Sequence, residues 1–255
     1  MALRRLTLSP AKRLVRLGNV DRMSVTSRLR AIGGPSSETS GIFPPAAHEH
    51  ANARLWTLVV DVVPLLQSSS LDLLDARGAP EYVHLCPGEH YRLLAALVRL
   101  LRPSLVVEVG TYQGHGVLAM LPELPDGGRI VTFDIVPWTA IPDCLLHAED
   151  LADRRVTQIL ADLGDSQQAK LHADLICTAD LIFVDAAKDG ALERRILAGF
   201  EGMKLKDGVM VVFDDIRQWN MLDIWRSIER PKLDATSLGH YSGTGLIDWT
   251  GSRDR

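Results

Sequence analysis

Residues 105–120 read LVVEVGTYQGHGVLAM, and this stretch decides the fold class. An apolar run ends near Glu108, three glycines follow as Gly110, Gly114 and Gly116, and a second apolar segment begins. The pattern predicts a buried strand, a glycine-rich turn and a helix, because glycine allows sharp turns and a close approach of the backbone to a ligand. Loops of this kind usually hold a nucleotide-like cofactor at the edge of a parallel sheet.

The chain after residue 104 alternates between strand-like and helix-like segments. Apolar runs predict strands at residues 104–109, 128–135, 155–162, 179–186, 207–215 and 244–249. Helices are predicted between them at residues 116–121, 165–173, 191–203 and 220–229, with a polar, helix-compatible stretch at 143–153. The alternation predicts an α/β fold, in which a doubly wound, mostly parallel sheet has helices on both faces.

Three more helices are predicted before the sheet, at residues 47–63, 70–76 and 87–101. We expect Pro64 to end the first and Pro103 to end the third, because proline lacks an N–H and disfavours helix at the residue before it. The expected globular domain is residues 42–255, with a helical region at 42–103 and a sheet core at 104–250.

The first 41 residues differ from the rest, because they are basic, contain few acids and end in the linker-like stretch GGPSSETSG. Three interpretations stay open: a mitochondrial transit peptide, an amphipathic arm that lies on an anionic membrane or a partner, and a partly disordered tail.

Composition narrows the class of protein. The apolar content of 46% and the net charge of −4 are ordinary for a soluble globular protein, so we expect no nucleic-acid partner. Cys86, Cys144 and Cys177 lack metal-binding spacing, which indicates reduced thiols and a cytoplasmic location. No apolar run approaches the roughly 18 residues of a membrane span.

The glycine spacing E-x-G-x-x-x-G-x-G differs from the dinucleotide fingerprint G-x-G-x-x-G. A carboxylate at Glu108 would repel a pyrophosphate but would tolerate a cationic sulfonium. The segment resembles the first motif of class I S-adenosylmethionine-dependent methyltransferases, and within them the O-methyltransferases related to catechol and caffeoyl-CoA O-methyltransferases. The resemblance implies a seven-stranded sheet whose last strand is antiparallel. It also implies cofactor contacts from Glu108, Gly110, Thr111, Tyr112, Gly114 and Gly116.

Several predicted strands end in acids, at Glu108, Asp134, Asp162, Asp185 and the pair Asp214 and Asp215. Parallel strands bind ligands at their carboxyl ends, so we expect these acids to share one site. Asp134 lies far enough beyond the glycine loop to bind ribose hydroxyls, as in methyltransferases and dehydrogenases alike. For Asp162, contact with adenine, which the resemblance implies, and a helix N-cap stay equally open.

The segment ADLIFVDAAKDG (residues 179–190) resembles the fourth motif of the same families. The resemblance implies that Asp185 is a metal ligand and that Lys188 is the general base. Asp214 and Asp215 stand where the family has an Asp-Asn metal-binding pair. Carboxylates at Asp185, Asp214 and Asp215 suit Mg²⁺, and also Mn²⁺ or Ca²⁺. A metal-free capping turn and a solvated lysine remain the alternatives.

The resemblance implies an S-adenosylmethionine-dependent methyltransferase that methylates a hydroxyl of a small molecule such as a sugar or a catechol-like diol. It also makes a homodimer one option for the assembly. Asp185 and Lys188 would be its catalytic residues, and a divalent cation would assist. The alternatives are a metal-independent methyltransferase, a non-catalytic cofactor-binding protein and, more remotely, a nicotinamide dehydrogenase. His240, Tyr241 and Ser242 precede the last strand, where we expect a hairpin turn rather than a lining of the acceptor pocket.

Overall fold

The computed structural model describes residues 50–84, 90–152 and 154–252. The expected basic arm and linker, with Cys86, lie outside the described residues. Within them Cys144 and Cys177 are free thiols. No described helix is long and apolar enough to cross a membrane.

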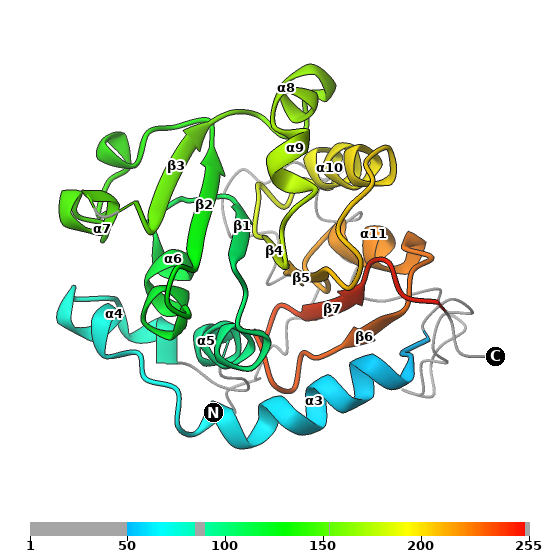
Figure 1. The fold of residues 1–255 in the computed structure, drawn as a ribbon, viewed down its shortest axis with the longest axis horizontal. Helices are drawn as coiled ribbons and strands as arrows, with labels where there is room; N and C mark the ends of the chain where they lie inside the picture. Colours follow the sequence, from blue (N-terminus) through cyan, green and yellow to red (C-terminus); the bar gives the residue numbers. More distant parts are fainter. Residues whose placement is uncertain (1–49, 85–89, 153, 253–255) are drawn as a thin grey trace, which may run out of the picture.

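A seven-stranded sheet forms the centre of the molecule, in the order β3-β2-β1-β4-β5-β7-β6 (Figure 1). The strands are β1 (Leu105–Val109), β2 (Arg129–Asp134), β3 (Val156–Leu160), β4 (Leu181–Val184), β5 (Met210–Asp214), β6 (Lys232–Asp234) and β7 (Thr244–Asp248). The first five are parallel, whereas β7 runs antiparallel to both β5 and β6. The doubly wound sheet and its antiparallel last strand are therefore confirmed. The edge strand β6 was not predicted, because three residues are too few for a periodic signal.

Helices cover both faces of the sheet (Figure 1). One face packs against α3 (Ala53–Leu66), α4 (Asp72–Ala76), α5 (His90–Leu101) and α6 (His115–Met120). The other packs against α9 (Ala173–Ile176), α10 (Ala191–Glu201) and α11 (Met221–Ser227), with α8 (Ser166–Leu171) beside α9 and α10. The short α7 (Ala148–Ala152) lies next to β3. Short 3-10 helices lie at η1 (Glu81–His84), η2 (Leu121–Glu123) and η3 (Trp138–Ala140).

Neighbouring strand residues point into different cores. Val106 packs in the core on the α5 side, whereas Val107 packs in the core on the α10 side. Because both faces are buried, the central strands are continuously apolar rather than alternating, which is the pattern that made them recognisable.

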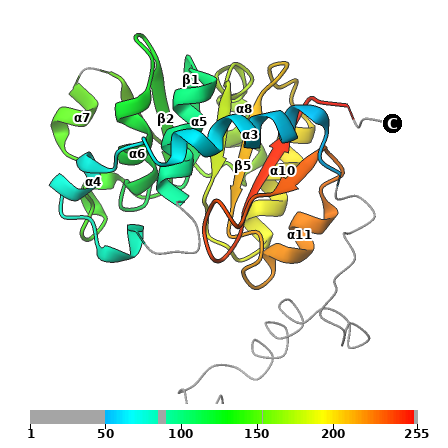
Figure 2. The same cartoon turned by 90° about the horizontal axis from the view of Figure 1, so that it is seen from below.

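The helix α3 begins and ends later than predicted, at Ala53 and Leu66 rather than at residues 47 and 63. It continues through Pro64 to Leu66, because Pro64 lies in the last turn, where only two residues follow it. The helix begins at an Asn52 cap, whose side chain accepts a hydrogen bond from Leu55 N at 3.1 Å and donates one to Asp248 at 2.9 Å. This cap fixes α3 against β7, and Figure 2 shows α3 crossing the face of the molecule from α4 towards β7.

Gly110 allows the loop after β1 to approach the end of β4. Its φ is +102°, and a Cβ at this position would lie 1.9 Å from the backbone oxygen of Asp185. We therefore expect Gly110→Ala to lower the free energy of unfolding by at least about 2 kcal/mol and to weaken cofactor binding. Urea unfolding measures the first effect, and Gly199→Ala is the matched control, because Gly199 lies in α10 with open space around it. Equal stability of the two variants would contradict the close approach.

Candidate active site

A cavity of about 1080 Å³ opens at the carboxyl ends of the parallel strands. It is lined by residues that come from all five of these strands or the loops after them, and by His90, Tyr91 and Tyr82 from the helical region before the sheet. The predicted site residues that line it are Gly110, Tyr112, Asp134, Asp162, Asp185, Lys188 and Asp214. The strand-end acids therefore converge on one cavity, as the order of the strands requires.

Glu108, Thr111, Gly114 and Gly116, like Asp215, are not among the residues that line the cavity. The Glu108 carboxylate is buried, accepts a hydrogen bond from the Thr132 hydroxyl at 2.6 Å and lies so close to Gly116 that a Cβ there would be 2.2 Å from it. The Thr132 and Thr111 hydroxyls are 2.8 Å apart. The Glu108 and Thr111 side chains therefore bond to Thr132 inside the protein, and the cofactor contacts of these four residues stay a prediction.

Burial raises the pKa of Glu108 to about 8, although the hydrogen bond from Thr132 opposes the shift. The folded protein thus keeps a proton that the unfolded chain releases above its ordinary pKa of 4.5. The contribution of Glu108 to stability should therefore fall as the pH rises from about 4.5 to about 8.

The variant Glu108→Gln stays neutral and should lose this pH dependence. We expect it to be more stable than the parent at pH 8.5 by on the order of 3 kcal/mol, and close to it at pH 5. Urea unfolding at both pH values measures the difference, with Glu149→Gln as an exposed control. Parallel pH profiles of parent and Glu108→Gln would show that Glu108 is not a buried neutral acid.

Asp134 organises the glycine loop. One carboxylate oxygen accepts hydrogen bonds from the backbone N–H groups of Thr111 and Tyr112, each at 3.0 Å, and the other accepts from Val136 N at 3.0 Å. The side chain still borders the cavity, where the ribose contact is predicted.

Asp162 does not cap α8. Asp165 does so instead, since its side chain accepts hydrogen bonds from Gln167 N at 2.8 Å and Gln168 N at 3.0 Å. Asp162 accepts a bond from Gly164 N at 2.7 Å and borders the cavity. The structure thus removes the capping alternative and leaves the adenine contact as the prediction for this residue.

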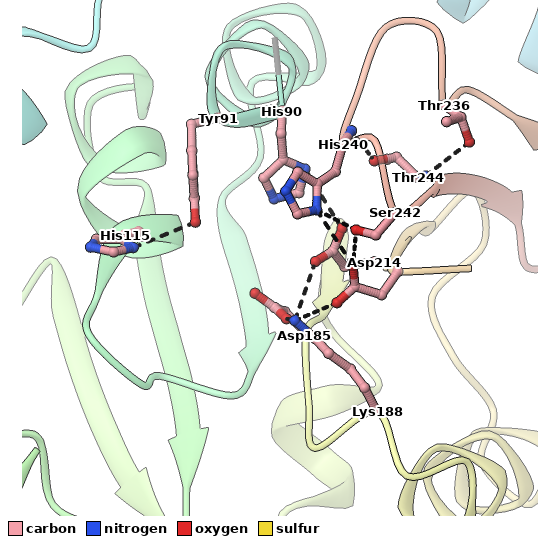
Figure 3. Close-up of polar contacts among 11 residues, drawn as sticks. His90, Tyr91, His115, Asp185, Lys188, Asp214, Thr236, His240, Ser242 and Thr244 are labelled. Carbon is pink, nitrogen blue, oxygen red and sulfur yellow. Dashed lines mark hydrogen bonds and ion pairs between the residues drawn. The ribbon is translucent and has the colours of Figure 1, made fainter. Parts of the chain in front are cut away.

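Lys188 lies among three carboxylates at the ends of β4 and β5 (Figure 3). Its Nζ is 2.9 Å from Asp185 Oδ1 and 3.7 Å from Asp214 Oδ2, and it also forms an ion pair with Asp215. Asp214 and Asp215 are buried, with relative exposures of 3% and 1%. The structure therefore brings the four predicted catalytic and metal-binding residues together, with the ammonium between the carboxylates.

The charges of this cluster depend on one another. Burial acts to lower the pKa of Lys188, but the carboxylates of Asp185, Asp214 and Asp215 outweigh it and raise that pKa. Burial, with the two neighbouring carboxylates, raises the pKa of Asp214 well above its usual range. Burial also acts to raise the pKa of Asp215, but hydrogen bonds and the nearby Lys188 charge lower it to about 2. Lys188 is thus held as an ammonium, so it can act as a base only when some of these carboxylate contacts are relieved.

Two residues of the cluster have strained backbones. Lys188 has φ 61° and Asp215 has φ 55°, in the left-handed region that side-chain-bearing residues rarely adopt. The buried carboxylate of Glu193 fixes the Lys188 loop by accepting hydrogen bonds from Lys188 N at 2.6 Å and Gly190 N at 2.9 Å. Sequence reasoning missed Glu193, although its place three residues after the helix-starting Gly190 is the spacing of a capping box.

Two histidines complete the far side of the cluster. His240 Nδ1 is 3.4 Å from Asp215 Oδ1 and 2.5 Å from Ser242 Oγ, and this hydroxyl also donates to Asp215. His90, in α5, is 3.7 Å from Asp214 Oδ1, and burial lowers its pKa to about 3. His240 and Tyr241 line the cavity, so the expectation of a hairpin turn alone was too limited. His90 was missed, because no local motif marks it.

The sheet order, the glycine loop after β1 and the acids at the strand ends define a Rossmann-like methyltransferase fold. Residues 83–220, more than half of the chain, match the family model described as O-methyltransferase. The chain therefore belongs to the O-methyltransferase family.

Individual relatives agree with this assignment. Catechol O-methyltransferase of Mus musculus is 32% identical over 126 residues, which are 49% of this chain and 47% of the relative. The Bos taurus catechol O-methyltransferase is 26% identical over 49% of this chain and 46% of its own length. The chain thus spans about half the length of the curated relatives it matches.

Solved structures show the same fold. A Podospora anserina methyltransferase bound to S-adenosylhomocysteine superposes with a TM-score of 0.51 at 19% identity, over 82% of this chain and 99% of that one. A candidate caffeoyl-CoA O-methyltransferase from Staphylococcus aureus superposes with a TM-score of 0.52 at 16% identity, over 75% of this chain and 98% of that one.

Proposed function

We propose that the chain is an S-adenosylmethionine-dependent O-methyltransferase that methylates a hydroxyl of a small molecule with the help of a divalent cation. The observation that carries this proposal is that one cavity joins the glycine loop after β1 to the carboxylate cluster at the ends of β4 and β5. The cavity is large enough for a cofactor and a small acceptor together.

The glycine-loop side fits S-adenosylmethionine. Its apolar wall includes Ile135, Ile141 and Leu163, which suit an adenine ring, and Asp134 offers a carboxylate for ribose hydroxyls. When bound, this cofactor supplies a methyl group on a cationic sulfonium. The chain contributes binding and alignment, and alignment can supply roughly 7 to 11 kcal/mol of a reaction barrier.

The carboxylate side fits a divalent cation. Asp214 Oδ1 is buried and has no hydrogen-bond partner among the described residues, and Asp185 and Asp215 add oxygen donors nearby. A cation held by these three residues would stabilise negative charge on an acceptor oxygen. As an ammonium, Lys188 can donate a hydrogen bond to that oxygen. Where reduced carboxylate contacts let Lys188 release a proton to solvent, the neutral amine can accept the proton of the hydroxyl.

The acceptor side is rich in rings. Tyr82, Tyr91, His240 and Tyr241 line the cavity beside the cluster. A flat aromatic diol packs better against such a wall than a sugar does. This wall and the similarity to catechol O-methyltransferases support a catechol-like acceptor.

Transfer of a labelled methyl group from S-adenosylmethionine tests the proposal. The acceptor panel should include catechol, phenol, a sugar with a vicinal diol and benzoate, each with Mg²⁺ and with EDTA. We expect catechol to be methylated in Mg²⁺ and not in EDTA. Phenol, which has a single hydroxyl, should not be methylated in either condition. Cofactor binding without turnover on any acceptor would instead indicate a non-catalytic protein.

The position of Lys188 supports one second candidate, a cation-independent O-methyltransferase. Its ammonium already compensates part of the charge of the three aspartates. Full catechol methylation in EDTA would favour this candidate over the cation-assisted reaction.

A further inference from the structure

We propose that an imidazole nitrogen of His240, supported by His90, completes the cation site on Asp214 and Asp215, so that the site holds a transition-metal dication of the Mn²⁺ to Zn²⁺ series. This inference rests on the proposed function because both place a divalent cation at Asp214 and Asp215. The inference goes further by naming the class of metal and adding imidazole ligands.

The aspartate pair presents different oxygens to its two sides. The Oδ2 atoms of Asp214 and Asp215 face Lys188. Their Oδ1 atoms face the imidazoles, with His90 Nδ1 at 3.7 Å from Asp214 and His240 Nδ1 at 3.4 Å from Asp215. Figure 3 shows the two histidines next to each other near Asp214, and their ring centroids are 5.2 Å apart. A cation on the imidazole side therefore leaves Lys188 in place.

The ligand atoms lie near enough to one another for small movements to bring them around one ion. One carboxylate oxygen each from Asp214 and Asp215 and one ring nitrogen from His240 lie within 4.8 Å of one another. Ligand atoms with bonds of about 2.1 Å lie roughly 3 to 3.6 Å apart around a single metal. Small side-chain adjustments would close the site.

Two unpartnered atoms point independently to a ligand here. His90 Nδ1 and Asp214 Oδ1 are buried, with residue exposures of 5% and 3%, and neither has a hydrogen-bond partner among the described residues. Their separation is too long for a hydrogen bond. Leaving a buried polar atom unsatisfied costs about 1 to 3 kcal/mol, so a bound cation between these atoms would relieve both.

The loop before β7 holds His240 in position. His240 N donates to the Thr244 hydroxyl at 2.8 Å, and Gly243 N donates to His240 O at 2.9 Å. Ser242 contacts both the imidazole and Asp215. Together these contacts hold the imidazole beside Asp215.

The donor set selects the class of metal. Mg²⁺ prefers oxygen ligands alone, whereas imidazole suits the transition metals. A mixed set of carboxylate oxygens and an imidazole nitrogen therefore indicates a metal such as Mn²⁺, Co²⁺ or Zn²⁺.

Mn²⁺ is the probe for the test, with the full chain stripped of metal and neither cofactor nor acceptor present. Pulsed electron paramagnetic resonance detects ¹⁴N nuclei bonded to Mn²⁺, and calorimetry gives the affinities for Mn²⁺ and Mg²⁺. We expect directly coordinated nitrogen in the parent chain. His240→Gln should reduce the nitrogen signal and weaken Mn²⁺ binding at least about tenfold, with little change for Mg²⁺.

Two further variants make the test specific. His90→Gln should also weaken Mn²⁺ binding, whereas His147→Gln, at an exposed position, should change neither signal nor affinity. Circular dichroism checks that each variant is folded. Mn²⁺ bound without nitrogen coupling, unchanged affinity in His240→Gln, or no Mn²⁺ binding would each overturn the inference.

Titration of the same protein with S-adenosylhomocysteine separates this inference from the proposed function. Binding of S-adenosylhomocysteine without nitrogen-coordinated Mn²⁺ would overturn the metal-site inference and leave the proposed function standing. Nitrogen-coordinated Mn²⁺ without cofactor binding would support the metal site and end the proposed function.

Discussion

Replacing Asp214 by alanine should lower kcat/KM for methyl transfer by about 10³-fold or more and remove the stimulation by divalent cations. Asp214 contacts both sides of the cluster, since one oxygen faces Lys188 and the other faces His90. Electrostatic stabilisation of a reacting oxygen by a metal is worth several kcal/mol, and each 1.4 kcal/mol is a factor of ten in rate.

Initial rates at varied Mg²⁺ and Mn²⁺ measure this effect. Asp61→Ala is the matched control, because Asp61 is exposed on α3, away from the cavity lining. Asp214→Asn preserves the shape of the side chain and should still lose most of the stimulation, which separates lost charge from lost packing. An Asp214→Ala variant with the normal metal response would show that the carboxylate cluster does not hold the cation.

The second large effect is expected at Asp134. Replacing it by alanine should weaken S-adenosylhomocysteine binding at least about 100-fold, because hydrogen bonds to charged groups contribute about 1.5 to 3 kcal/mol each. The variant loses the bonds that hold Thr111 N and Tyr112 N, and with them the shape of the loop, as well as the predicted ribose contact.

Calorimetric titration measures the affinity, and Asp134→Asn provides a graded comparison. Asparagine keeps one acceptor oxygen, so the affinity of Asp134→Asn for S-adenosylhomocysteine should lie between the affinities of the parent and the alanine variant. The melting temperature of each variant shows whether the sheet is intact. Unchanged affinity in Asp134→Ala would remove this residue from the cofactor site.

The parts of the fold that the sequence predicted are those with local signals. The strands were visible because burial on both faces makes them continuously apolar, and the loop was visible because Gly110 must approach the Asp185 backbone. The convergence of Asp134, Asp162 and Asp185 followed from the rule that parallel strands end at one edge.

The remaining features depend on contacts between distant residues. His90 reaches Asp214 from a helix more than 100 positions earlier, and no periodicity encodes that approach. The charge state of Lys188 depends on three carboxylates from the ends of two strands, β4 and β5. The roles of Glu108 and Thr111 could not be separated from those of residues that line the cavity, because sequence spacing does not show which side of a loop a side chain occupies.

Titration calorimetry with S-adenosylhomocysteine, in Mg²⁺ and again in EDTA, tests the central claim most directly. The cofactor product should bind with about micromolar affinity in both conditions, because the residues of the glycine loop and Asp134 are distinct from the carboxylate cluster. Absence of binding in both conditions would contradict the assignment of the cavity to S-adenosylmethionine and with it the proposed reaction.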